Sequence, residues 1–296
     1  MRLTWVVIGL SMVSGGCDRF NTVDSDSPAP EAPAVEAPAP AVEAGVKIAE
    51  APVVAATQPV AAEDKVASDW SYEGATGPDL WGTLRPEYAK CGNGQVQSPI
   101  DLPDGKGNGN TPGPVLLEYK PVPLAIQNDG HTISFQNSSE SSVLIDGQRY
   151  FFVRGEVHAP AEHRVGGKGF DMELELVHRN EADELAVFSV LLNKGEEHAG
   201  LKTIFDYLPF EVSGQVDVIP GVNVDISKLL PEAFSYRYYE GSLTSPPCSE
   251  GVRWFVSTKL GTVSENQLKR YQSVLKVSTN RPLQPSNNRK VGIFNR

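Results

Sequence analysis

The stretch YFFVRGEVHAPAEHRVGGKGFDMELELVH, residues 150–178, decides how this chain folds. Its first part is aromatic and β-branched, and its last part alternates apolar with acidic residues, as a strand with one buried face does. Glycines at 166, 167 and 169 indicate a turn between the two parts. The stretch therefore predicts two strands joined by a turn.

Each of these strands gathers particular side chains on one face, because residues two positions apart point the same way. The residues that share a face are Arg154, Glu156 and His158 on the first strand, and Glu173, Glu175 and Val177 on the second. Polar residues in such an alternation face water in most antiparallel sheets. On spacing alone, these carboxylates would be solvent-exposed.

The composition limits the possible partners. The chain has 296 residues, a formal net charge of −11 and a pI near 5.0. It carries no basic patch, so the sequence argues against nucleic acid as a partner. Residues 68–296 are long enough for one core, and all-β domains of this size often remain single.

The N-terminus has the features of an export signal. Residues 1–16 contain a basic residue, a short apolar run and small residues, as a signal peptide does. Cys17 follows, where a bacterial lipoprotein is cleaved and acylated, although Ser14 replaces the leucine that is usual three positions earlier. We therefore expect a lipid on Cys17 to anchor the protein at the periplasmic side of a bacterial membrane. Asp18 indicates the inner membrane under enteric-type sorting.

A low-complexity segment follows the cysteine. Residues 17–67 are rich in Ala, Pro and acidic residues, and no aromatic residue occurs between 21 and 67. Such a composition cannot bury enough apolar surface to fold. We expect an extended tether between the lipid and the folded domain.

The remaining chain, 68–296, is dominated by strand patterns. Strand-like runs lie at 115–119, 124–127, 132–136, 142–145, 149–153 and 185–192. Helical patterns are confined to 200–208 and 264–274, the second with Ser264 as a cap. The sequence predicts a mostly β domain, a large and mainly antiparallel sheet with short surface helices.

Two motifs in the opening stretch resemble a known family. HAPAEH at 158–163, followed by MELELVH at 172–178, resembles the centre of an α-class carbonic anhydrase, whose pattern is HFHAPSEH and then E-x-H-x-V-H. Further matches, including QSPI at 97–100, extend the resemblance over essentially all of 68–296. It implies the twisted central sheet of that family and, as family activity, zinc-dependent hydration of CO2.

The resemblance fails at the metal. The family binds zinc through three histidines, and only His158 matches one of them, with Glu156 and Glu175 at the other two positions. Two carboxylates and a histidine reduce the charge of a zinc site from +2 to 0, so a bound water would be less acidified. Arg154 also replaces a glutamine of the cavity wall and can pair with Glu156. We expect no cofactor, or weak binding of zinc or another divalent metal, and little or no CO2 hydration.

The supporting residues of the family site are matched. The resemblance assigns Thr244 as the threonine that accepts a hydrogen bond from the hydroxide, Glu162 as the glutamate that orients it, and His131 as the proton shuttle. The residues that match the apolar wall of the CO2 site are Val177, Val187, Leu243, Val252 and Trp254. Without the resemblance, these would be ordinary core residues, a structural Thr–Glu pair and a surface turn histidine.

The cysteines are odd in number, which requires an explanation in an exported protein. Cys91 and Cys248 remain when Cys17 carries lipid, and both fall where exported bacterial members of the family have their single disulfide. The alternative is an unmodified N-terminal cysteine with two free thiols.

Three functions remain open from the sequence. The first is a lipid-anchored, catalytically inactive or strongly impaired module that binds a ligand or a protein partner. The second is a metalloenzyme with an altered Glu/His/Glu site, including residual carbonate dehydratase activity. The third is a structural subunit of a membrane or envelope complex.

Overall fold

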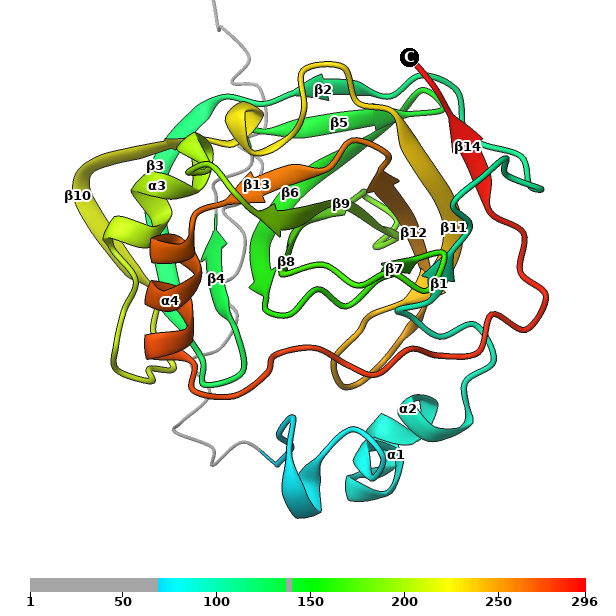
Figure 1. The fold of residues 1–296 in the computed structure, drawn as a ribbon, viewed down its shortest axis with the longest axis horizontal. Coiled ribbons are helices and arrows are strands. Elements are labelled where there is room, and N and C mark those ends of the chain that lie inside the picture. The colour runs from blue at the N-terminus through cyan, green and yellow to red at the C-terminus, as the bar shows by residue number, and fades with distance from the viewer. Residues whose placement is uncertain (1–68, 137–139) are drawn as a thin grey trace, which may run out of the picture. The chain divides into compact units, whose positions relative to one another are not determined.

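A computed structural model describes residues 69–136 and 140–296 (Figure 1). The predicted signal peptide, the anchor at Cys17 and the tether lie outside these described residues. Among the residues described, no helix is long and apolar enough to cross a membrane.

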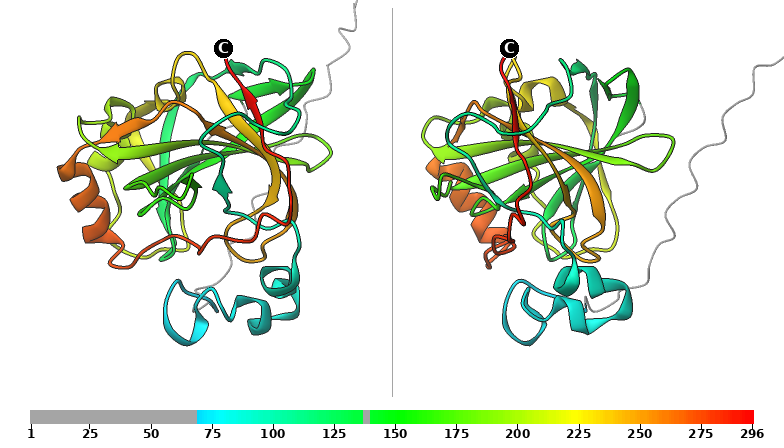
Figure 2. Two further views of the ribbon diagram at one scale, coloured as in Figure 1. Left: turned by 45° about the vertical axis from the view of Figure 1, so that its right-hand side comes forward. Right: turned by 90° about the vertical axis from the view of Figure 1, so that its right-hand side faces the viewer.

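A 12-stranded sheet forms the centre of the domain, in the order β10-β3-β4-β6-β8-β9-β12-β11-β14, with β2, β5 and β13 attached beside this path (Figures 1 and 2). Neighbouring strands are antiparallel except where β9 pairs with β12 and β13. The strands of this sheet are β2 Leu116–Glu118, β3 Pro121–Asn128, β4 Ile133–Gln136, β5 Ser142–Ile145, β6 Gln148–His158, β8 Met172–Arg179, β9 Leu185–Lys194, β10 Asp217–Asp225, β11 Tyr236–Ser242, β12 Glu250–Ser257, β13 Gly261–Val263 and β14 Gly292–Phe294. A separate parallel pair joins β1 Asp101–Leu102 to β7 Arg164–Val165. The mostly β, mainly antiparallel architecture predicted from the sequence is confirmed.

The helices are short. They are η1 Gly74–Thr76, α1 Trp81–Leu84, η2 Pro86–Tyr88, α2 Ala89–Asn93, α3 Ala199–Asp206, η3 Ile226–Leu229 and α4 Glu265–Val274. The two predicted helices correspond to α3 and α4, which contact each other. Ser264 caps α4 through a capping box with Gln267, which satisfies backbone N–H groups at both positions.

The opening stretch of sequence forms the neighbouring strands β6 and β8. Their register sets Glu156 opposite Glu175 and His158 opposite Glu173. Directly opposed residues lie on the same face of a sheet, so the two predicted groups of side chains form one group. Gly155 keeps the other face of β6 close to Phe135, since a Cβ at this glycine would lie 2.0 Å from the ring.

One prediction about this stretch was wrong. The alternation in the second strand suggested one face in water, but β8 is buried from Met172 to His178. It lies between β6 and β9 in the middle of the sheet, and its acidic residues contact an interior polar network. The acidic residues of β8 face buried polar partners instead of solvent. An alternating sequence pattern looks the same in both cases.

The N-terminal helices are tied to the rest of the domain by a disulfide. Cys91 in α2 bonds to Cys248, which precedes β12, as the family resemblance implied. Trp70, Tyr72 and Trp81 pack edge-to-face around one another beside this bond. The disulfide and these aromatic residues therefore form one small core around α1 and α2.

Candidate functional site

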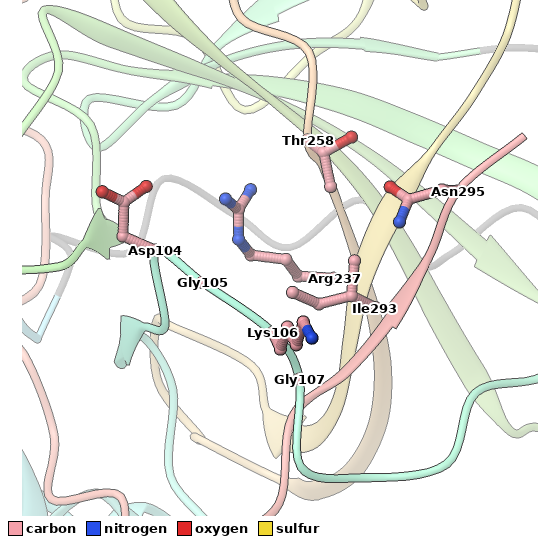
Figure 3. A pocket seen from close by; sticks show the side chains of 8 residues that line it. All are labelled: Asp104, Gly105, Lys106, Gly107, Arg237, Thr258, Ile293 and Asn295. Carbon is pink, nitrogen blue, oxygen red and sulfur yellow. The ribbon is translucent and has the colours of Figure 1, made fainter.

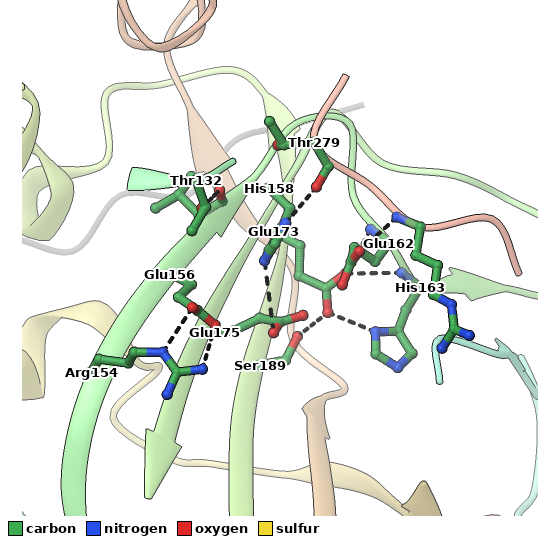
Figure 4. Close-up of polar contacts among 12 residues, drawn as sticks. Thr132, Arg154, Glu156, His158, Glu162, His163, Glu173, Glu175, Ser189 and Thr279 are labelled. Carbon is green, nitrogen blue, oxygen red and sulfur yellow. Dashed lines mark hydrogen bonds and ion pairs between the residues drawn. The ribbon is translucent and has the colours of Figure 1, made fainter. Parts of the chain in front are cut away.

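An arginine and a glutamate form a forked ion pair on β6 (Figure 4). Arg154 Nε donates to Glu156 Oε1 at 2.8 Å, and Nη2 approaches Oε2 at 3.5 Å. Their side chains are 28% and 17% exposed. Burial alone would raise the pKa of Glu156, but the charge and hydrogen bond of Arg154 lower it below its ordinary value. Glu156 is therefore an ionised carboxylate held by a permanent cation.

The opposing glutamate has the reverse character. Glu175 is 2% exposed, and its Oε2 lies 4.0 Å from His158 Nε2. Burial raises the pKa of Glu175 well above its ordinary value, and the neighbouring carboxylates Glu162 and Glu173 raise it further. Glu175 therefore ionises less readily than an ordinary glutamate. The pKa values of Glu156 and Glu175, which face each other, are shifted in opposite directions.

His158 is oriented from behind by the C-terminal segment. The backbone carbonyl of Thr279 contacts its Nδ1, which directs Nε2 toward Glu175. Burial lowers the pKa of His158, but the charges of Glu162 and Glu156 offset this effect and raise it overall. His158 Nε2 and Glu175 Oε1 are buried and have no hydrogen-bond partner among the described residues.

The matched Thr–Glu pair is also assembled. Glu162 Oε1 accepts a hydrogen bond from the backbone N–H of Arg281 at 2.7 Å. Burial raises the pKa of Glu162, whereas His158, this N–H group and the Thr244 hydroxyl lower it in part. Thr244 therefore lies next to Glu162, as the resemblance implied.

Glu173 anchors the polar network beneath these residues. Its carboxylate accepts from the backbone N–H groups of Glu162 and His163, and it contacts His163 Nδ1 at 2.8 Å and the Ser189 hydroxyl. Burial would raise the pKa of Glu173, but these partners lower it. His163 Nε2 in turn contacts the Tyr239 hydroxyl at 2.6 Å. The network fixes the loop that carries Glu162.

His131 is engaged by the N-terminal segment. Its ring stacks on Trp70 with centroids 3.6 Å apart, and its Nε2 lies 2.9 Å from the Trp70 carbonyl. The side chain is 13% exposed. A proton shuttle must move a proton between the site and water, and this packing restrains the ring.

The apolar residues gather as expected. Val177, Val187, Val252 and Trp254 belong to one buried cluster, and Leu243 packs against it. This cluster lies on the same side of the sheet as Glu175, since Val177 follows Glu175 by two positions on β8.

The donor atoms do not form the three-histidine zinc site of the family that the sequence resembles. Glu156, His158 and Glu175 each offer one ligand atom, and these atoms lie within 4.8 Å of one another. However, the carboxylate of Glu156 is bonded to Arg154, whose cation opposes a divalent ion. Glu175 would have to lose a proton to bind a metal. Arg154 already balances the charge of Glu156, and the raised pKa of Glu175 disfavours its ionisation.

Sequence reasoning missed two residues of the site. Tyr72 is partly buried, and burial together with the charge of Glu162 raises the pKa of its hydroxyl well above the ordinary value. Arg281 holds Glu162 through its backbone, while its guanidinium donates to Gln97 Oε1 and to two backbone carbonyls. Both residues lie in segments that matched the family. Their partners are far away in the sequence, so no local periodicity could indicate these contacts.

Comparison with known proteins identifies relatives over the described domain. A family model described as eukaryotic-type carbonic anhydrase matches residues 76–294. A carbonic anhydrase of Pectobacterium atrosepticum is 34% identical over 229 residues, which cover 77% of this chain and 91% of the relative. Dioscorin DB3S of Dioscorea polystachya is 36% identical over 236 residues, which cover 77% of this chain and 88% of the relative.

The similar solved structures also include carbonic anhydrases and a dioscorin. The α-carbonic anhydrase of Thermovibrio ammonificans, in complex with sulfanilamide, has a TM-score of 0.72 and 38% identity, and the match covers 75% of this chain and 98% of that one. Dioscorin complexed with ascorbate has a TM-score of 0.71 and 33% identity, with 77% and 98% covered.

Proposed function

Because the chain belongs to the eukaryotic-type carbonic anhydrase family but has a charge-balanced ion pair at the metal position, we propose that it is a non-catalytic binding module. It would keep the fold and the apolar wall without hydrating CO2 through a zinc-bound hydroxide. The forked contact between Arg154 and Glu156 carries this proposal.

The fork supports the proposal through charge and geometry. A guanidinium remains protonated at any physiological pH, so Glu156 retains a strong partner that a metal would have to displace. A site with two glutamates also leaves zinc with no net positive charge to acidify a water. Both effects act against the family reaction, even though Thr244 and Glu162 are in place.

A binding function agrees with the features proposed for the N-terminal part of the chain. The lipid proposed on Cys17 and the tether would hold the module near a membrane, where it would meet a protein partner or a small ligand. Since dioscorin has been solved with ascorbate, a small organic molecule is one class of ligand to test.

A second candidate is favoured by one observation. His158 Nε2 and Glu175 Oε1 are buried, lack hydrogen-bond partners among the described residues, and belong to the same cluster of possible ligand atoms. Mixed histidine and carboxylate ligands suit Zn, Mn or Fe. This candidate is a metalloenzyme with an altered site.

Metal content separates the two. The purified full-length chain should be incubated with zinc, manganese or iron, desalted, and measured by elemental analysis and by stopped-flow CO2 hydration. Substoichiometric metal and background hydration would support the binding module. Stoichiometric metal that is lost in Glu175→Gln would support the metalloenzyme and refute the proposal.

A further inference from the structure

A surface hollow lies at the β11–β14 edge of the sheet, away from the Glu156 cluster (Figure 3). Its volume is about 570 Å³, within the ~300–1,000 Å³ typical of small-molecule sites. Side chains of the loop after β1, of β11, of the segment after β12 and of β14 line it. The side chains that matter for its chemistry are Asp104, Lys106, Arg237, Thr258, Ile293 and Asn295. We refer to it as the Arg237 hollow.

Arg237 is the buried cation of this hollow. The residue is only 9% exposed, and its Nε donates to the carbonyl of Pro103 at 2.9 Å. Its two terminal nitrogens make no hydrogen bond or ion pair with any part of the chain that the structure describes. Figure 3 shows the guanidinium between Asp104 and Thr258. A buried arginine with two free donors on one edge is an arrangement suited to a planar anion.

The loop over the hollow is held at both ends. Arg237 binds its start at Pro103, and Asn108 binds its end through two hydrogen bonds with Val291, one from the Asn108 N–H and one from the Val291 N–H. Gly107 permits this close approach, because a Cβ there would lie 2.6 Å from the Val291 carbonyl. The segment between these contacts, which carries Asp104 and Lys106, is therefore fixed over the arginine before any ligand arrives.

The charges of the hollow favour one negative charge. Arg237 and Lys106 contribute two cations, and Asp104 contributes one anion, which leaves a net charge of +1. Asp104 is near enough to act on the charge of Arg237, but it makes no ion pair with it in the described structure. Thr258 and Asn295 add a hydroxyl and an amide that can bind further oxygens.

We propose that the Arg237 hollow binds a hydroxylated organic monocarboxylate, with the carboxylate on the terminal nitrogens of Arg237 and the hydroxyl groups near Thr258 and Asn295. The free edge of the guanidinium matches the two oxygens of a carboxylate. The hollow is larger than a bare anion needs, so the carboxylate is carried on a body of several carbon atoms. This site is separate from the Glu156 cluster, so its test does not depend on the proposed function.

The test uses the full-length chain with D-gluconate, a six-carbon hydroxylated carboxylate. Sorbitol is the matched control, since it has the same chain without the carboxylate. Ligand-observed NMR or calorimetry at constant ionic strength should show binding of gluconate and none of sorbitol. Arg237→Gln should weaken binding about 10-fold or more, because a charge-assisted forked contact is lost. Arg237→Lys should also weaken it, because the charge remains but the fork does not.

Two further variants keep the proposal testable if changes at Arg237 disturb the loop. Lys106→Gln should weaken gluconate binding about 2- to 5-fold, as expected for an exposed charge, and Asp104→Asn should strengthen it by a similar factor. Lys276→Gln, at an exposed lysine of another hollow, should have no effect. Equal binding of sorbitol, binding unchanged in folded Arg237→Gln and in Lys106→Gln, or tighter binding of inorganic phosphate would overturn the proposal.

Discussion

Arg154 Nε donates a hydrogen bond to Glu156 Oε1 at 2.8 Å. The two residues are two positions apart and share one face of β6. The guanidinium lowers the pKa of Glu156, whereas burial raises the pKa of the opposing Glu175. The two glutamates at the metal positions of the family are therefore not equivalent, although the sequence presents them as the same substitution.

Isosteric variants should reveal this difference. Glu156→Gln should reduce the free energy of unfolding by about 1–3 kcal/mol at pH 7, because it leaves a half-buried arginine without its partner. Glu175→Gln should cost less, because the raised pKa of Glu175 shows that the fold disfavours the charge that this variant removes. Urea unfolding of both variants measures the difference, and Asp206→Asn at the exposed Lys202 pair serves as the surface control, at roughly 0.5 kcal/mol or less.

The same variants should differ in pH dependence. The pKa of Glu156 is lowered on folding, so its contribution is present above the unfolded pKa of about 4.3 and is lost as the pH falls through the folded value. The pKa of Glu175 is raised, so stability is lost as the pH rises above about 4.3 toward the folded value. Glu175→Gln should therefore gain stability relative to the parent between pH 4 and 7. A constant difference over this range would contradict the raised pKa of Glu175.

Restoring the family ligands should restore metal binding. The triple change Arg154→Gln, Glu156→His and Glu175→His should bind one zinc per chain, because it supplies three neutral nitrogen ligands and removes the opposing cation. Elemental analysis and stopped-flow CO2 hydration measure the outcome, with the double histidine variant that keeps Arg154 as the control. We expect the control to bind zinc less tightly. A triple variant that remains free of zinc would show that the pocket differs beyond its ligands, and would favour a structural subunit.

The disulfide between Cys91 and Cys248 should be a large stabilising element. It closes a separation of 157 residues, for which loss of unfolded-chain entropy gives about 4–5 kcal/mol as an upper value. Without reductant, the Cys91→Ser variant should unfold at a lower urea concentration than the parent. Reduction should lower the midpoint of the parent to a similar value and leave the variant unchanged. Equal midpoints for the parent with and without reductant would refute the prediction.

Anchoring is tested by the cysteine of the export signal. Cys17→Ser should move the protein from the membrane fraction to the soluble periplasmic fraction, because the acylated thiol would be absent. Fractionation with blotting measures this, and mass spectrometry of the parent would detect the lipid. Membrane association that is unchanged in the variant would contradict lipidation of Cys17.

Strand and helix patterns were readable where the sequence is locally periodic. The predicted runs at 142–145 and 185–192 correspond to β5 and β9, and α4 begins at the predicted cap Ser264. Strands β1, β7 and β10 to β14 were not predicted. The first two are only two residues long, and each of β10 to β14 contains a Gly, which weakens the strand pattern.

Much of the candidate site was predictable, including the pairing of Arg154 with Glu156, but Tyr72 and Arg281 were missed. The face of Arg154, Glu156 and His158 follows from period-two geometry, and the family pattern added Thr244 and Glu162. The raised pKa of Glu175 depends on burial and on Glu162 and Glu173, which approach only in the folded chain. The place of the loop at 104–108 over Arg237 depends on contacts of Asn108 with the distant Val291, which no local pattern indicates.

The buried Arg281 has a consequence for the order in which the protein can be made. Its guanidinium reaches Gln97, the Ser98 carbonyl and the Cys91 carbonyl, at separations of 183 to 190 residues. A ribosome adds this arginine more than 180 residues after those partners, so their surroundings cannot be completed until synthesis has passed residue 281. A premature stop shortly before this position would therefore loosen the beginning of the domain as well as shorten its end.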